Sequence, residues 1–344
     1  AGSPEDKALQ EISKSSDPAK KIELLDKWLA EFGQGDMAIL AYEQYIAVYG
    51  AQKNYDKAFE YGDKMFALDP DAFSSVINLF RLCQEKGDAQ KLFAYGEQAA
   101  AILQRYRAKA APEATGAELF EQQKKETLAG LADTVNYIQY TMFTTAYGTH
   151  DPAARAALLE KFIGAFPDSS FAGDAKVMAA DAYQQAREPG KMVEFARKIL
   201  AKEPNNFWML VVLADYWATQ KEIEHLDQAE EYAKKALDLV GQAAKPAQLP
   251  EEEWQKQKAL ETGLAWSALG QIHFHKNRDA QAVDALKTAS PLLKPYDYYY
   301  GRNLYFLGFA LARMKRLAEA RPILDEATKV NSPYKDYAAQ TLAK

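Results

Sequence analysis

Apolar residues recur three or four positions apart along almost the whole chain, and this spacing predicts a series of amphipathic helices. The clearest stretch runs from Ala265 to Pro295. One helical face there carries Trp266, Leu269, Gly270 and His273. A turn follows, after which Asp279 is expected to cap a second helix whose inner face carries Ala282, Leu286 and Ala289. The stretch therefore predicts two helices packed closely around a tight turn.

The spacing of these residues resembles the tetratricopeptide repeat, whose pattern is W-x2-L-G-x2-Y, then A-x3-F, then P. His273 stands where the family prefers Tyr, Leu286 where it prefers Phe, and Pro295 comes one residue late. The next repeat, from Leu304 to Pro333, matches at Leu307, Gly308, Ala320, Leu324 and Ala327. The resemblance implies an all-α fold, a TPR-like α-solenoid that winds antiparallel helix pairs into a right-handed superhelix.

A longer similarity indicates an internal duplication. The segment DPAKKIELLDKWLAEF at Asp17 resembles DPAARAALLEKFIGAF at Asp151, with seven of sixteen positions identical and an offset of 134 residues. We therefore expect an N-terminal segment (1–16), a first arm (17–150), a second arm (151–294), and a last repeat with a capping helix (295–344). Each arm is expected to hold one long helix, at 117–147 and 251–275, and extra residues at 222–224 are expected to lengthen one turn.

Composition and charge narrow the function classes. Hydrophobic residues make up 48% of the chain and charged residues 26%, as in an ordinary soluble protein. The net charge of −6 argues against nucleic acid as a main partner, and no apolar run is long enough for a membrane span. The chain begins at Ala1 without methionine, which fits a cytoplasmic protein in trimmed form or an exported, periplasmic protein without its signal peptide. The sequence leaves both compartments and the oligomeric state open.

No motif predicts catalysis or a metal site. The sequence has no phosphate-binding loop, no dinucleotide fingerprint and no H-E-x-x-H. His273 and His275 point about 200° apart on a helix and do not chelate one metal ion. The lone Cys83 lies on an apolar helical face, which indicates a buried thiol. We therefore expect no catalytic residue, no metal and no cofactor, although carboxylates brought together by folding leave an enzyme as an alternative.

Aromatic residues give the strongest binding signal, because the chain has 20 tyrosines and a run at 298–300. In the tetratricopeptide family the first helix of each pair lines the concave surface, where peptides and helices bind. The residues expected on that surface are Asn78, Tyr140, Phe274, Tyr299 and Arg302. Tyr140 and Phe274 are related by the 134-residue offset. In the alternative interpretation these rings pack between helices and Arg302 pairs with Asp297.

The sequence thus predicts a non-catalytic scaffold that holds a protein or peptide partner on its concave face. Tyrosine and arginine favour an extended or helical partner segment with acidic and apolar residues. A helical-repeat protein that binds a small solute or a glycan by stacking on its tyrosines is the second hypothesis.

Overall fold

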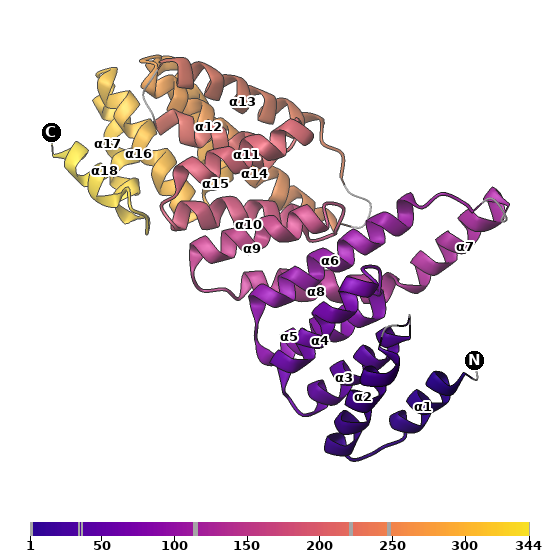
Figure 1. Ribbon diagram of the computed structural model, residues 1–344. Helices are drawn as coiled ribbons and strands as arrows, with labels where there is room; N and C mark the ends of the chain where they lie inside the picture. Colours follow the sequence, from indigo (N-terminus) through magenta and orange to yellow (C-terminus); the bar gives the residue numbers. More distant parts are fainter. Residues whose placement is uncertain are drawn as a thin grey trace. The chain divides into compact units, whose positions relative to one another are not determined.

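The computed structural model describes residues 3–33, 35, 37–112, 116–219, 223–245 and 249–343. Every regular element in these ranges is a helix, eighteen of them in all, and none is a strand (Figure 1). The all-α fold predicted from the hydrophobic periodicity is confirmed.

The chain divides into two compact units, of which the first is Ala1–Ala186. The helices of this N-terminal unit are α1 (Pro4–Ser13), α2 (Pro18–Phe32), α3 (Ala38–Ala51), α4 (Tyr55–Leu68), α5 (Phe73–Lys86), α6 (Ala89–Ala108), α7 (Ala117–Gly130), α8 (Ala132–Tyr147), α9 (Pro152–Ala165) and α10 (Ala172–Gln185).

The second unit is Arg187–Lys344. The helices of this C-terminal unit are α11 (Pro189–Lys202), α12 (Phe207–Thr219), α13 (Ile223–Gln242), α14 (Glu251–His275), α15 (Asp279–Leu293), α16 (Asp297–Arg313), α17 (Leu317–Lys329) and α18 (Lys335–Leu342).

Glycines set the close packing of the helix pairs in the C-terminal unit. A Cβ atom placed on Gly270 of α14 would lie 2.5 Å from Cγ of Leu286 in α15. Gly308 of α16 meets Leu324 of α17 at the same distance. Both glycines hold the small-residue position of the predicted repeat, so each first helix can pack directly on its partner. These are the tetratricopeptide-like pairs that the sequence predicts.

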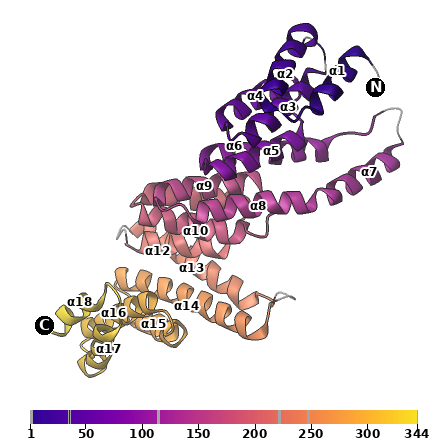
Figure 2. The same cartoon turned by 90° about the horizontal axis from the view of Figure 1, so that it is seen from below.

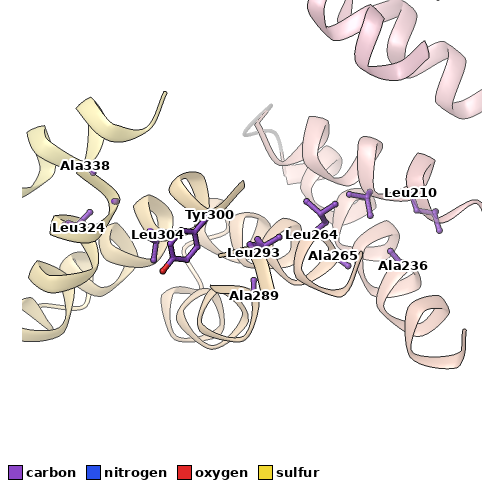
Figure 3. Packing of buried hydrophobic residues seen from close by; sticks show 12 residues of the cluster. Leu210, Ala236, Leu264, Ala265, Ala289, Leu293, Tyr300, Leu304, Leu324 and Ala338 are labelled. Carbon is purple, nitrogen blue, oxygen red and sulfur yellow. The ribbon is translucent and has the colours of Figure 1, made fainter. Parts of the chain in front are cut away.

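One apolar cluster links consecutive pairs of the C-terminal unit. Figure 3 shows its buried residues passing from Leu210 on α12, through Leu264 on α14, to Leu324 on α17 and Ala338 on α18. Trp266 is half-buried and packs against this cluster. Because α18 contributes Ala338 to the cluster, the last helix covers the end of the apolar core, as expected of a capping helix.

Buried aromatic rings and polar anchors hold the first helices of the N-terminal unit together. Trp28 on α2 is buried, and its Nε1 donates a hydrogen bond to the backbone oxygen of Glu5 at 3.0 Å. Tyr45 on α3 is fully buried, and its hydroxyl donates to Asp26 at 2.5 Å. Burial raises the pKa of Tyr45, so this hydroxyl stays protonated and keeps its bond.

The helix bounds repeat at the offset found in the sequence. The bounds of α3, α4 and α6 shifted by 134 residues are those of α10, α11 and α13. Asp17 and Asp151 both cap the helix that follows through their side chains. This agreement supports an internal duplication, whose direct test is a superposition of the two segments. The division into four parts stays a prediction.

Two local expectations were wrong, and a third lies partly outside the described residues. The helix predicted over 117–147 is broken at Leu131 into α7 and α8, whereas α14 is continuous (Figure 2). Gly130, a poor helix former, ends α7, whereas its equivalent Leu264 is buried in the core and supports α14. The cap of α15 is Arg278 rather than Asp279, because Asn277 takes a left-handed conformation (φ 59°) and ends the turn early. Ile223 already belongs to α13, and residues 220–222 of the predicted longer turn lie outside the described residues.

A buried carboxylate ties α13 to the end of α14. Glu230 accepts hydrogen bonds from Lys234 and Lys276, each at 2.6 Å, and from Arg278 at 3.0 Å. Burial by itself raises the pKa of Glu230, but the hydrogen bonds from the two lysines outweigh it and hold the pKa at about 2.

This lowered pKa predicts a specific acid sensitivity. Because the pKa of Glu230 in the folded protein lies below the ordinary glutamate value of 4.5, Glu230 stabilises the fold above pH 4.5 and loses this contribution as the pH falls toward about 2. We expect Glu230→Gln to be less stable than wild type at neutral pH and to lose less stability over that acid range, as measured by urea denaturation. The matched control is the exposed Glu253→Gln, which should follow wild type. Parallel acid profiles for wild type and Glu230→Gln would contradict the assignment.

Candidate protein-binding surface

Helix α16 and the start of α18, with the residue that precedes α18, carry five tyrosines linked by ring contacts in the C-terminal unit. We call them the tyrosine surface: Tyr298, Tyr299, Tyr305, Tyr334 and Tyr337. Tyr298 is 42% exposed and Tyr337 55% exposed, and the other three are half-buried. The surface therefore offers two accessible rings on a partly buried aromatic base.

Helical spacing explains how the rings meet. Tyr298 and Tyr305 are two turns apart on α16, while Tyr334 precedes α18 and Tyr337 lies in its first turn. The ring of Tyr334 bridges the helices, with its centroid 6.3 Å from that of Tyr298 and 5.8 Å from that of Tyr305. Tyr337 completes the group at 5.9 Å from Tyr305. These separations are those of favourable aromatic pairs, so the rings hold each other in place.

The hydroxyl groups of Tyr305 and Tyr334 stay neutral. Burial raises the pKa of Tyr334 to about 12, and burial together with Tyr337 raises the pKa of Tyr305. At neutral pH each of these rings combines apolar area with a hydroxyl group that donates and accepts hydrogen bonds. Residues of this kind are enriched where proteins bind partners.

An ion pair between a buried arginine and a half-buried aspartate lies beside the tyrosine surface. Arg302 of α16 is 7% exposed, and its Nη2 donates to Asp215 of α12 at 2.9 Å. Its guanidinium carbon lies 5.9 Å from the ring centroid of Tyr298 and 5.8 Å from that of Tyr299. Desolvation by burial lowers the pKa of Arg302 and the charge of Asp215 outweighs it, so the net direction is upward and the guanidinium stays charged.

The run of three consecutive tyrosines points in three directions, as helical geometry requires. Tyr298 is exposed, Tyr299 is half-buried and Tyr300 is buried. The hydroxyl of Tyr300 donates to Glu326 of α17 at 2.5 Å, so this ring fastens α16 to α17. The expectation that at least one ring of the run is accessible is confirmed for Tyr298.

The structure brings Tyr299 and Arg302 together, but it buries two of the residues expected on an open surface. Phe274 is 6% exposed and packs against Phe306 and Phe309 of α16. Arg302 is buried as well, and its partner is Asp215 rather than the Asp297 of the alternative interpretation. Both residues were expected to be accessible, because the first helices of a widely open groove expose such residues to solvent. In this protein α14 and α16 pack closely enough to enclose them.

Asn78 and Tyr140 belong to the N-terminal unit. Asn78 is exposed on α5, and Tyr140 is 56% exposed on α8 with its ring 6.0 Å from that of Phe171. The alternative in which Tyr140 is buried between helices is therefore wrong. The participation of Asn78 and Tyr140 in binding stays a prediction.

The sequence reasoning missed Tyr334, Tyr337 and Asp215. The two tyrosines are three residues apart in the segment predicted to be a cap, and that spacing was a usable signal of a shared face. Asp215 precedes Arg302 by 87 residues on a different helix. No local pattern connects the two, so the ion pair became visible only in the fold.

Metal chemistry and membrane insertion find no support in the described part of the chain. No three His, Cys, Asp or Glu side chains there are placed to hold a metal ion. None of the helices found there is both long enough and apolar enough to cross a bilayer. Cys83 is buried, as predicted, and burial raises the pKa of its thiol to about 12, which keeps it unreactive.

The chain is similar to solved structures but matches no sequence family. No family model matches the chain, and no curated protein sequence matches it. Among solved structures it is similar to the TPR domain of P58(IPK), at 11% identity over 98% of this chain and 97% of that chain, with a TM-score of 0.25. It is also similar to yeast Tom70, at 14% identity over 95% of this chain and 84% of that chain, with a TM-score of 0.30. The fold assignment rests on the helix pairing and the glycine contacts of this chain.

Proposed function

We propose that the protein is a non-catalytic scaffold that binds a protein or peptide partner on the concave face of its helix pairs, with the tyrosine surface as the main contact. The observation that carries the proposal is the exposure of Tyr298 and Tyr337 on a base of packed rings. Exposed aromatic residues held by rigid helices provide contact area at a small entropic cost, because their positions are set before binding.

The chemistry of the surface favours a partner segment with apolar and acidic residues. The rings supply apolar area and hydroxyl groups, and the positive charge of Arg302, which is paired with Asp215, lies beside Tyr298 and Tyr299. An apolar side chain of the partner would pack on Tyr298 and Tyr337, which lie on different helices of the same surface. An extended segment or a single helix is the form that fits a row of side chains on adjacent helices.

Affinity capture tests the proposal with variants that should not disturb folding. Tyr298→Ser with Tyr337→Ser removes the two exposed rings, and the matched control Leu317→Ser removes a residue of α17 that is 52% exposed. We expect the tyrosine double variant to lose at least one protein that wild type and Leu317→Ser both retain from lysate of the source organism. The melting temperatures of all three should agree within a few degrees, because exposed substitutions change stability by less than ~0.5 kcal/mol.

A different result would favour the second hypothesis. If wild type and the double variant capture the same proteins, the tyrosine surface is not a protein contact. A thermal-shift screen of soluble sugars and other small solutes then decides, because a ligand that raises the melting temperature of wild type and not of the double variant identifies a solute or glycan site.

A further inference from the structure

The ion pair between Asp215 and Arg302 uses only part of its hydrogen-bonding capacity. Nη2 of Arg302 donates to Oδ2 of Asp215, while Nε of Arg302 and Oδ1 of Asp215 are both buried without a hydrogen-bond partner. Arginine and carboxylate groups commonly bind through two parallel hydrogen bonds, and buried polar atoms left unpaired are costly. The pair therefore leaves one arginine donor unused inside the protein.

The pair also bridges two helices, α12 and α16, that share α14 as a neighbour. α12 and α16 each pack on α14, which lies between them. On α14, Ser267 and Gln271 are buried although they are polar, and the hydroxyl of Ser267 has no hydrogen-bond partner. By helical spacing both lie on the side of α14 that carries Phe274, the ring that packs on α16. The inner side of these first helices is thus a polar surface that is closed to solvent.

Arg302 connects this closed surface to the tyrosine surface. Its guanidinium faces Tyr298 and Tyr299 as well as Asp215. Tyr334 also interacts electrostatically with Arg302 and raises its pKa. The same cation therefore contacts the intramolecular carboxylate and the rings that we assign to partner binding. If Arg302 exchanged Asp215 for another carboxylate, the environment of Tyr298 and Tyr299 would change.

We propose that Asp215 acts as an internal latch, occupying in the unbound protein the place that a carboxylate of the partner takes when it binds. The inference rests on the proposed function, because it describes how the tyrosine surface is regulated. In the open state Asp215 has released Arg302 and the guanidinium is accessible, and a partner carboxylate then accepts hydrogen bonds from Nε and Nη2 of Arg302 together. The partner places an apolar group on Tyr298 and Tyr299 beside that carboxylate.

The latch lowers the apparent affinity of acidic partners. A ligand that binds only the open state has an apparent Kd equal to its intrinsic Kd divided by the open fraction. The substitution Asp215→Asn keeps the shape of the side chain and removes the charge that competes for Arg302. Such a variant should bind acidic ligands more tightly and leave neutral ligands unaffected.

The test uses N-acetylphenylalanine, which carries a carboxylate beside an aromatic ring, and its neutral analogue N-acetylphenylalaninamide. Binding is followed through the NMR signal of the Nε–H group of Arg302, assigned by its absence in Arg302→Lys. The variants are Asp215→Asn and the control Asp297→Asn, which removes an exposed carboxylate from the same helix as Arg302. We expect Asp215→Asn to bind the carboxylate about tenfold more tightly than wild type, and Asp297→Asn to match wild type.

Three results overturn the latch: equal affinities for wild type and Asp215→Asn, an equal gain for the carboxylate and the amide, or an equal gain in both variants. If Asp215→Asn does not fold, the wild-type spectrum decides. The carboxylate and not the amide must then shift the Nε–H signal of Arg302, and no shift at saturation overturns the latch. Failure of the latch is distinguishable from failure of the proposed function, because the capture of partners by wild type and its loss in Tyr298→Ser with Tyr337→Ser do not depend on Asp215.

Discussion

Trp266→Ala is expected to lower the free energy of unfolding by about 3 kcal/mol. Trp266 packs against the apolar cluster that runs from α12 to α18, so truncation opens a cavity that the neighbouring helices fill only in part. Because the ring is only half-buried, the expected loss of stability lies at the low end of the range for replacing a large core residue with a small one. Urea denaturation followed by circular dichroism measures it.

The control for this substitution is Tyr147→Ala, which removes an aromatic ring that is 64% exposed. Its effect on stability should stay within about 0.5 kcal/mol of wild type. A cost below about 1 kcal/mol for Trp266→Ala would show that the half-buried ring contributes little to the core, contrary to its place in the repeat pattern.

Gly270→Ala and Gly308→Ala should each destabilise the protein by about 1–3 kcal/mol, although alanine is the better helix former. The added Cβ would lie 2.5 Å from the side chain of Leu286 in the first case and of Leu324 in the second, so either the leucine must leave its packed position or the helix pair must move apart. Denaturation measurements on the two single variants test the close packing of α14 on α15 and of α16 on α17.

The matched control is Gly241→Ala in α13, where a Cβ meets no atom within 4 Å. At this position the substitution causes no steric clash, so only the higher helix propensity of alanine matters. The free energy of unfolding should rise by up to about 1 kcal/mol. Opposite signs at the packed and the open glycines are the expected pattern. A gain in stability at Gly270 would mean that the two helices are not held by close contact at this point.

Sequence reasoning predicted the fold because, in a helical repeat, the residues that contact each other lie close together in the sequence. The positions of Gly270 and Gly308 follow from spacing within one helix, and both face a leucine of the paired helix. The break between α7 and α8 was missed because it depends on whether other helices pack against this part of the chain. Gly130 ends α7, whereas the equivalent Leu264 is held in an apolar core.

The candidate site was predictable only in part for the same reason. Tyr299 and Arg302 share a helix, so their proximity follows from their spacing. The ion pair of Arg302 depends on Asp215, which comes from a helix 87 residues earlier, and no spacing rule relates the two. Tyrosine content indicated a binding surface, but the pairing of α16 with α18 that assembles it is a property of the folded unit.

Site-specific photo-crosslinking tests the central claim, that the tyrosine surface is where a protein partner binds. A benzophenone amino acid in place of Tyr298 or Tyr337 puts the reactive group on the surface, and the same group in place of Leu317 puts it on an exposed site of α17. After irradiation in lysate of the source organism, we expect one common protein to be cross-linked from both tyrosine positions and not from Leu317. Cross-links from Leu317 alone, or the same proteins from all three positions, would contradict the assignment of the tyrosine surface.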